Sequence, residues 1–234
     1  MQVEIWSDIM CPFCYIGKRR FEKALASFEG AESIDVVWKS YQLDPNQADI
    51  PGVSINQYLA ERKGWTVEYA REMNKYVTDM AADEGLVYEL DKAVVANSFN
   101  AHRLIQMAKT IGKGDAAEEA FFIAYFTNGK NINDPAVIIA IGVSIGLDAA
   151  AIEAMLDSGK FVNDVRSEAA EAGSLGAKGV PYFLFNRKYA VSGAQAVATF
   201  TQVLNTAFAD WKTTQSENIT ILATGDSCDV DGNC

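Results

Sequence analysis

The sequence predicts an α/β fold in which one sheet is interrupted by a large all-helical insertion. Two observations carry this prediction. Strand-like runs gather near both ends of the 234-residue chain, and the long stretch between them has helical periodicity and is too long for a loop. Because short strands need partners, the two ends are expected to close into one sheet. The predicted organisation is a discontinuous domain of residues 1–50 and 171–212, a helical insertion at 51–170, and a C-terminal tail at 213–234.

The N-terminal half of the sheet is predicted from two apolar runs. Residues 3–6 form the first, and residues 34–39 form a β-rich run that continues to Leu43 before Asp44-Pro45 ends it. A helix is expected to begin near Tyr15, directly after the first strand. This half therefore reads as strand, helix, strand.

Helices in the insertion are predicted from apolar spacing and from the residues at their ends. A Pro at a first turn, an Asp or Thr at an N-cap and a Gly after a C-terminus are the signals used. Asp115 followed by Glu118 predicts a capping box. The expected helices span 66–84, 97–111, a segment from Asp115, a segment from Pro135 to before Gly146, a segment from Asp148, and 159–173.

The C-terminal half of the sheet is predicted as a hairpin followed by a helix. Residues 179–185 form an aromatic-rich strand, residues 186–188 a turn, and residues 189–191 the returning strand. An amphipathic helix over 193–212 closes the fold.

Composition excludes some classes of function. The net charge of −11 argues against nucleic-acid binding, because phosphate contacts need a basic face. Neither a basic segment followed by an apolar one nor a long apolar run occurs, so we expect no signal peptide and no membrane span. The expected location is the cytoplasm.

The strongest motif is the pair Cys11 and Cys14, separated by two residues at a strand-to-helix junction. This arrangement is typical of thiol–disulfide redox sites. Unpaired backbone N–H groups and the helix dipole favour a thiolate at the first cysteine, and the second can attack the resulting mixed disulfide. A zinc half-site and a structural disulfide are the alternatives. The only histidine is His102 and the other cysteines lie at the far end, so no metal site is expected.

Two polar residues have open interpretations. His102 is either a proton donor near the dithiol or a histidine packed within a helix, and the second interpretation is favoured. Asp8, three residues before Cys11, either shuttles protons, caps the helix or is solvated. The aromatic cluster at residues 121–126 reads as core.

The tail carries a second cysteine pair, Cys228 and Cys234. It is either an auxiliary redox pair that exchanges with the first, a disulfide that closes the tail, or part of a weak metal site. The first is favoured because the chain already has a dithiol motif and tails are often mobile.

Several strings resemble the DsbA-type proteins of the thioredoxin fold, and among them the FrnE subfamily. The resemblance spans residues 1 to about 212. It rests on the strings SDIMCPFCYIGKR at 7–19, NAHRL at 100–104, GVPYF at 179–183 and SGAQ at 192–195.

This resemblance implies roles for six residues. Cys11 is the nucleophile and Cys14 the resolving thiol. Pro181 is a cis-proline facing them, which leaves the backbone of Val180 to hold an extended substrate by strand addition. Pro12 and Phe13 lie on the substrate side. The DsbA type has a histidine at the place of Phe13, so a less oxidising dithiol is expected here.

The expected function is that of a thiol–disulfide oxidoreductase or isomerase acting on disulfide-containing proteins or small molecules. No cofactor motif occurs. Glutathione, as reductant or co-substrate, or a thioredoxin system would recycle the dithiol. Two alternatives stay open. The kappa-class glutathione transferases and 2-hydroxychromene-2-carboxylate isomerases have a similar architecture, with serine where Cys11 stands. A peptide-binding chaperone would keep the fold without the chemistry.

Overall fold

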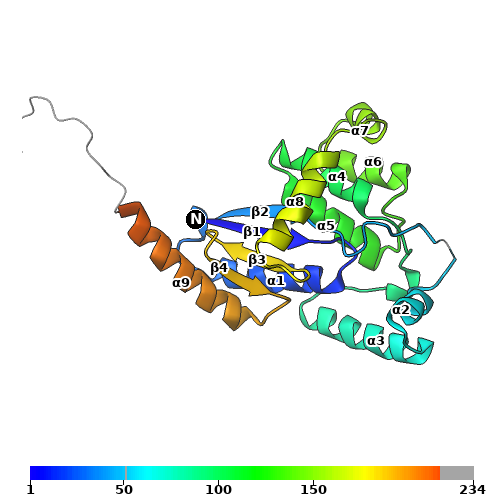
Figure 1. The fold of residues 1–234 in the computed structure, drawn as a ribbon, viewed down its shortest axis with the longest axis horizontal. Coiled ribbons are helices and arrows are strands. Elements are labelled where there is room, and N and C mark those ends of the chain that lie inside the picture. The colour runs from blue at the N-terminus through cyan, green and yellow to red at the C-terminus, as the bar shows by residue number, and fades with distance from the viewer. Residues whose placement is uncertain (51, 217–234) are drawn as a thin grey trace, which may run out of the picture.

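The computed structural model describes residues 1–50 and 52–216, and a four-stranded mixed sheet lies at its centre (Figure 1). The strand order is β2-β1-β3-β4. Strand β1 (Gln2–Ser7) pairs in parallel with β2 (Asp35–Ser40) and antiparallel with β3 (Tyr182–Phe185), which pairs antiparallel with β4 (Tyr189–Ser192). The two ends of the chain therefore close into one sheet, as predicted.

Two helices cover one face of this sheet. They are α1 (Pro12–Ala26) and α9 (Val197–Ser216). Because strand side chains alternate between faces, every second residue of β1 and β3 points to these helices. The resulting core joins Val3, Ile5, Phe21, Phe183, Phe185, Phe200, Leu204 and Phe208.

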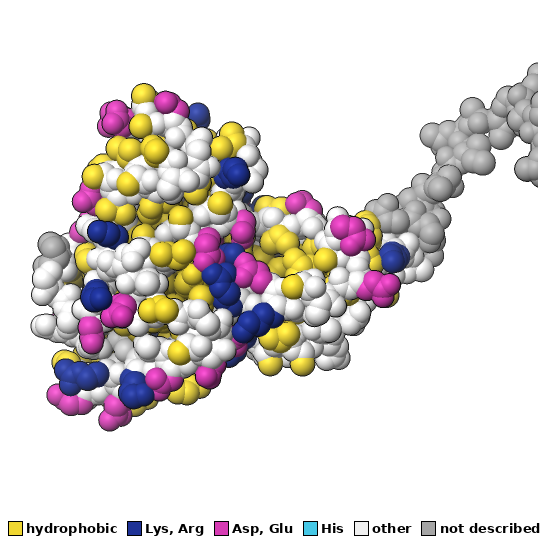
Figure 2. Space-filling view, turned by 180° about the vertical axis from the view of Figure 1, so that it is seen from behind, with side chains coloured by type: hydrophobic (Ala, Val, Ile, Leu, Met, Phe, Trp, Pro, Cys, Tyr) yellow, Lys and Arg dark blue, Asp and Glu magenta, His cyan; other side chains and the backbone are white. Residues whose placement is uncertain are grey.

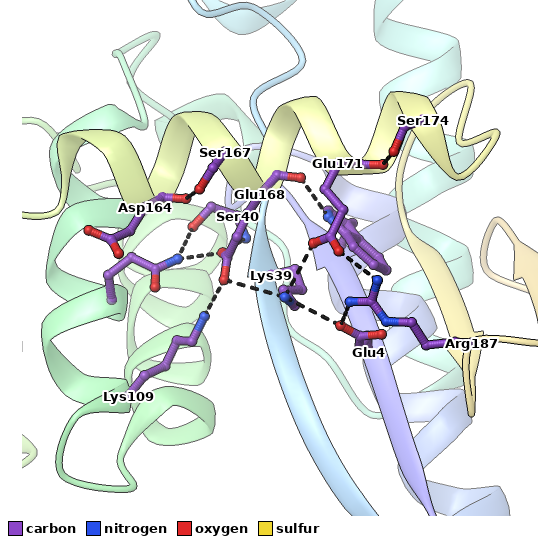
Figure 3. Close-up of polar contacts among 12 residues, drawn as sticks. Glu4, Lys39, Ser40, Lys109, Asp164, Ser167, Glu168, Glu171, Ser174 and Arg187 are labelled. Carbon is purple, nitrogen blue, oxygen red and sulfur yellow. Dashed lines mark hydrogen bonds and ion pairs between the residues drawn. The ribbon is translucent and has the colours of Figure 1, made fainter.

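Helix α8 (Val162–Ser174) crosses the opposite face, where it is held by polar as well as apolar contacts (Figure 3). The indole of Trp6 packs there and donates to the backbone carbonyl of Glu168 at 2.8 Å. The Glu168 carboxylate accepts from the Ser40 N–H at 2.7 Å and from Lys109 at 2.6 Å. Both faces of the sheet are thus covered.

Between β2 and β3 the chain forms the predicted helical insertion. Its remaining elements are α2 (Ile55–Lys63), α3 (Val67–Asp83), α4 (Phe99–Lys109), α5 (Gly114–Phe122), a π-helical turn η3 (Ile123–Thr127), α6 (Pro135–Ser144) and α7 (Ala149–Leu156), with a short 3-10 turn at Leu90–Lys92. A further 3-10 turn, Ala31–Ser33, lies outside the insertion, between α1 and β2. Their core includes Cys11, Cys14, Tyr15 and Ile16, so the start of α1 is packed inside the insertion.

Ion pairs also join α1 to the insertion. Arg19 pairs with Glu119 of α5, and Arg20 pairs with Glu84 at 2.6 Å. Seen from behind, the molecule carries a band of mixed basic and acidic side chains between hydrophobic areas on either side (Figure 2). No helix among residues 1–50 and 52–216 is long and apolar enough to cross a membrane.

Helix N-caps follow the sequence signals in three places and depart from them in one. Thr66, Asp134 and Asp148 each accept a backbone N–H, as predicted. The capping box at Asp115 and Glu118 is wrong: α5 begins at Gly114 after Lys113. Asp115 instead accepts the indole N–H of Trp38 at 2.9 Å, and Glu118 is buried, so tertiary contacts decide their roles.

Other boundaries differ by a few residues. Strand β2 ends at Ser40, because the Leu43 N–H turns to the Asp8 carboxylate at 2.7 Å. Helix α9 begins at Val197, after Gly193 has taken a positive φ of 81°, and continues to Ser216. The pair Cys228 and Cys234 lies outside the described residues.

Candidate active site

The predicted dithiol lies at the start of α1. Cys11 is the N-cap residue, with extended backbone, and Pro12 takes the first helical position, where its lack of an N–H costs nothing. The Cys14 N–H donates to the Cys11 carbonyl at 3.0 Å, and the Cys11 N–H donates to the Asp8 carbonyl at 2.9 Å. The motif therefore begins the helix, as predicted.

The two cysteines, both free thiols, occupy different environments. Cys11 is 4% exposed and lines a cavity, whereas Cys14 is 1% exposed and is not among the residues that line it. Burial, and then the neighbouring Cys11 thiol, raise the pKa of Cys14 well above its ordinary value. Cys11 is thus the cysteine that a molecule in the cavity can reach.

The segment before β3 faces the dithiol. The Val180–Pro181 peptide bond is cis, as expected, and the Cys11 Sγ lies 3.5 Å from the Val180 carbonyl oxygen. Within the described residues, the Val180 N–H has no hydrogen-bond acceptor. Gly17 lets α1 approach, since a Cβ at this position would lie 3.0 Å from the Pro181 ring.

A largely apolar cavity of about 420 Å³ opens beside Cys11. The start of α1, the segment after β2, α2 and α3 form it. Phe13, 38% exposed, and Trp65, also 38% exposed, line it, which agrees with the expectation that Phe13 is accessible. Other lining residues are Met10, Pro12, Leu43, Ile55, Leu59, Met73, Val77, Leu90, Phe126 and Val180, with the ion pair of Asp44 and Arg62 among the polar ones.

Four aromatic rings stack beside the motif, Tyr15 from α1 and three others from the insertion. Tyr15 stacks on Phe122 with ring centroids 4.6 Å apart, and Tyr88 stacks on Phe126 at 4.5 Å. The Tyr88 hydroxyl donates to the Pro12 carbonyl, between the two cysteines, at 2.7 Å. The phenylalanines are core, as predicted. The role of Tyr88 has no signal in the sequence, because its contact is long-range.

Four buried polar side chains lie behind the dithiol: Ser7, Asp8, His102 and Glu118. The His102 Nε2 lies 3.4 Å from Asp8 Oδ1, and both side chains are at most 2% exposed. Asp8 is therefore not solvated, and His102 packs inside the fold. Glu118 was not a predicted site residue. Its burial, opposed by His102 and Ser7, raises its pKa to about 7.

The buried Arg103 of α4, next to His102, donates to backbone carbonyls at the end of α7 and just after it. It supports the fold and is not part of the site.

The sheet, the helical insertion and the dithiol at the start of α1 define a thioredoxin-like protein of the DsbA class. Residues 2–205 match the DSBA-like thioredoxin domain family, and the chain belongs to this family. A probable DsbA oxidoreductase from Streptomyces coelicolor, SCO1869, is 37% identical with a TM-score of 0.85, covering 100% of this chain and 98% of that one. The uncharacterized protein YwbO of Bacillus subtilis is 25% identical over 72% of this chain and 78% of its own length.

More distant solved structures share the fold. The cytosolic disulfide reductase DsbM from Pseudomonas aeruginosa, in a structure with GSH, has a TM-score of 0.61 at 16% identity, over 92% of this chain and 100% of that one. A 2-hydroxychromene-2-carboxylate isomerase has a TM-score of 0.60 at 14% identity, over 94% and 100%.

Proposed function

We propose that this protein is a thiol–disulfide oxidoreductase, with isomerase activity towards disulfide-containing proteins. The observation that carries the proposal is the asymmetry of the cysteine pair. Cys11 lines the cavity and lies next to the backbone of Val180. Cys14 is buried behind Cys11. This is the arrangement that a nucleophile and a resolving thiol require.

In this mechanism Cys11 attacks a substrate disulfide as the thiolate. Its place at the N-cap of α1 favours the anion, because the first N–H groups of the helix have no partners within it. Cys14 then attacks Cys11, forms the Cys11–Cys14 disulfide and releases the reduced substrate. Two external thiols, or one external dithiol, then reduce the Cys11–Cys14 disulfide and are themselves oxidised to a disulfide.

The substrate segment is proposed to bind as an extended strand along Val180 and Pro181. The N–H and the carbonyl of Val180 supply the backbone contacts to the substrate. Pro12 and Phe13 contact the substrate from the other side, and the apolar cavity takes a side chain next to its cysteine.

Glutathione or a thioredoxin system is proposed as the reductant, in a cytoplasmic location. The bound GSH in the DsbM structure supports glutathione as a ligand of this fold. Assignment to the FrnE subfamily is proposed on the strings at 7–19, 100–104, 179–183 and 192–195. Cys228 and Cys234 are proposed to act as an auxiliary redox pair.

The experiment that tests the function is the reduction potential of the Cys11–Cys14 pair. The pair is equilibrated with glutathione in a variant carrying Cys228→Ser and Cys234→Ser. We expect a value below that of DsbA, about −120 mV, because Phe13 cannot stabilise a thiolate as a histidine can. A value near about −270 mV marks a reductase, and one near about −180 mV an isomerase.

Two variants separate this function from its alternatives. Insulin reduction is expected to be lost in both Cys11→Ser and Cys14→Ser proteins. If glutathione-dependent isomerisation of a small molecule persists in Cys14→Ser, the result would favour the 2-hydroxychromene-2-carboxylate isomerase class instead. A chaperone would be favoured by two results together. The variant with both Cys11→Ser and Cys14→Ser would still suppress the aggregation of a client protein, and the wild type would turn over no disulfides.

A further inference from the structure

The cavity beside Cys11 contains a buried polar group that the protein itself leaves without a partner. Tyr125 lines this cavity and is 2% exposed. No hydrogen bond joins its hydroxyl to another group in the described part of the chain. The hydroxyl is not fully enclosed, in contrast to the unpartnered Ser7 Oγ and Glu118 oxygen, so the cavity is the space that it faces. Because a buried hydroxyl without a partner is costly, it marks a place where a ligand can bind.

The other buried polar side chains that line the cavity, Asp8 and Gln47, are engaged within the protein. Asp8 accepts two backbone N–H groups, at 3.3 and 2.7 Å. Gln47 donates to a backbone carbonyl at 2.6 Å and accepts from the Tyr58 hydroxyl. Tyr125 is therefore the buried residue of this wall whose hydroxyl is left for a ligand.

A π-helical turn carries Tyr125. In η3 the Asn128 N–H donates to the Ile123 carbonyl, five residues earlier, at 3.0 Å. Such turns are rare and frequently occur at functional sites. Two consecutive residues of this turn, Tyr125 and Phe126, line the cavity, with their rings edge to face and the centroids 4.9 Å apart. The turn thus presents a free hydroxyl and an aromatic ring next to each other.

The rest of the lining suits an aromatic guest. Phe13 and Trp65 are partly exposed and supply two further rings, and aliphatic and methionine side chains complete the wall. Aromatic rings pack well against such neighbours, edge to face or offset. The volume of about 420 Å³ is typical of sites that enclose a small ligand, so one aromatic side chain can enter without rearrangement.

A tyrosine of the substrate matches both the apolar space and the free hydroxyl. Its ring fills the space, and its own hydroxyl can donate to the Tyr125 hydroxyl or accept from it. Burial raises the pKa of Tyr125, so this residue stays neutral and keeps both capacities. A charged side chain would lose its hydration and gain only one neutral partner, and phenylalanine would leave the Tyr125 hydroxyl unpaired.

We propose that the cavity beside Cys11 is a subsite for a tyrosine that flanks the reactive cysteine of a polypeptide substrate, and that Tyr125 selects its phenol hydroxyl. The inference rests on the proposed oxidoreductase function and names a substrate class for it. A polypeptide is the source because Val180, whose backbone is proposed to hold an extended strand, lines the same cavity. Tyr125 acts in selection and takes no part in the exchange of sulfurs.

Peptide disulfides test the selection directly. Each peptide carries one cysteine as its mixed disulfide with thionitrobenzoate, and the residue before or after that cysteine is tyrosine, phenylalanine or alanine. Cys11 of the Cys228→Ser, Cys234→Ser protein attacks the peptide sulfur, and thionitrobenzoate leaves as the coloured thiolate. In at least one of the two positions, we expect tyrosine to react about 5-fold faster than phenylalanine and about 50-fold faster than alanine.

Tyr125→Phe in the same protein removes the hydroxyl and keeps the ring. In this variant we expect tyrosine and phenylalanine peptides to react at equal rates, both still faster than alanine peptides. The matched control is Tyr76→Phe, whose side chain is exposed and does not line the cavity, and it is expected to keep the preference for tyrosine. An unchanged preference in Tyr125→Phe, or no preference with the wild-type site, would overturn the inference.

A stability measurement separates selection from a structural role. Because the Tyr125 hydroxyl has no partner within the described chain, Tyr125→Phe is expected to unfold at the same urea concentration as the wild type or at a higher one. A lower unfolding midpoint would show that the hydroxyl is bonded inside the fold, and the subsite would be rejected.

A trapped complex tests the subsite with Tyr125 unchanged. In Cys14→Ser the tyrosine peptide stays joined to Cys11 as a mixed disulfide, because the resolving thiol is missing. NMR is expected to show nuclear Overhauser effects between the ring of the peptide tyrosine and the rings of Tyr125 and Phe126. If the peptide ring contacts neither residue, it binds elsewhere and the inference fails.

Insulin reduction distinguishes this inference from the proposed function. A wild type that reduces insulin but does not prefer tyrosine peptides supports the function and rejects the subsite. A preference for tyrosine that is lost in Tyr125→Phe, in a protein that does not reduce insulin, supports the subsite and rejects the function.

Discussion

Cys11 and Cys14 are one helical turn apart, but their chemistry is set by residues that are distant in the sequence. Cys11 borders the cavity and the Val180 carbonyl, and Cys14 is enclosed by the insertion. Backbone geometry at the start of a helix is local, so the motif could be predicted. The difference in burial could not, because it depends on which segments fold over each sulfur.

Tyr88 provides a test of this long-range support. Removal of its hydroxyl in Tyr88→Phe deletes the 2.7 Å hydrogen bond to the Pro12 carbonyl while the stacked ring remains. We expect the free energy of unfolding in urea to fall by about 1 kcal/mol. The control is Tyr76→Phe, whose side chain is 56% exposed. Equal stability of the two variants would show that the hydroxyl does not hold the motif.

At the scale of the element, helix ends were predicted correctly where the signal is local. Thr66, Asp134 and Asp148 cap their helices within two or three residues of themselves. Asp115 has the same sequence signal, but the Trp38 indole and Lys18 bind its carboxylate first. A capping pattern therefore fails where a side chain from another element competes for the acid.

Helix α8 depends on polar contacts to the sheet, and Glu168 is their centre (Figure 3). Glu168→Gln removes a carboxylate that is 12% exposed and accepts from Ser40 and Lys109. We expect a loss of about 2 kcal/mol in the free energy of unfolding, because charge-assisted hydrogen bonds are lost from a mostly buried site.

The control is Asp164→Asn, on the same helix one turn earlier, where the side chain is exposed. It is expected to change stability little. Hydrogen exchange should show earlier opening of α8 in Glu168→Gln than in this control. The same exchange rates in both would mean that the apolar contacts of Trp6 alone hold the helix.

At the scale of the whole molecule, the buried Glu118 makes stability depend on pH. Its pKa is about 7 in the folded protein against an ordinary value of 4.5, because burial disfavours the anion. The unfolded chain thus loses this proton first as pH rises. The contribution of Glu118 to the free energy of unfolding is fully present below its ordinary pKa, and it is lost as the pH rises through its pKa in the folded protein.

Glu118→Gln removes this dependence. Relative to wild type, we expect the variant to gain about 3 kcal/mol of unfolding free energy between acid pH and pH 8. The pKa of Glu119 is shifted in the opposite direction. Burial would raise it, but Arg19 and Tyr15 hold it below the ordinary value. Glu119→Gln is therefore expected to lose stability over the same range. The measurement is urea unfolding at a series of pH values. If the unfolding free energies of both variants changed with pH in the same way, the assignment of the buried charge to Glu118 would be contradicted.

The fold as a whole was predictable because its pattern is simple, whereas half of the candidate site was not. Strand-like ends and a helical middle already indicate a closed sheet with an insertion. The dithiol and Pro181 lie in short recognisable strings. Tyr88, Glu118 and the cavity lie where the insertion packs against α1. Packing between such distant segments cannot be predicted from a local pattern in the sequence.

The origin of the site in distant segments has a consequence for the order of events during synthesis. Cys11 and Cys14 leave the ribosome first, while Glu118 on α5 and Val180 before β3 follow much later. A nascent chain therefore carries the two sulfurs before it carries the helices that enclose them or the segment before β3 that borders Cys11. The cavity and the backbone edge beside Cys11 therefore form only after the segment that carries Val180 and β3 has been synthesised and has paired with β1.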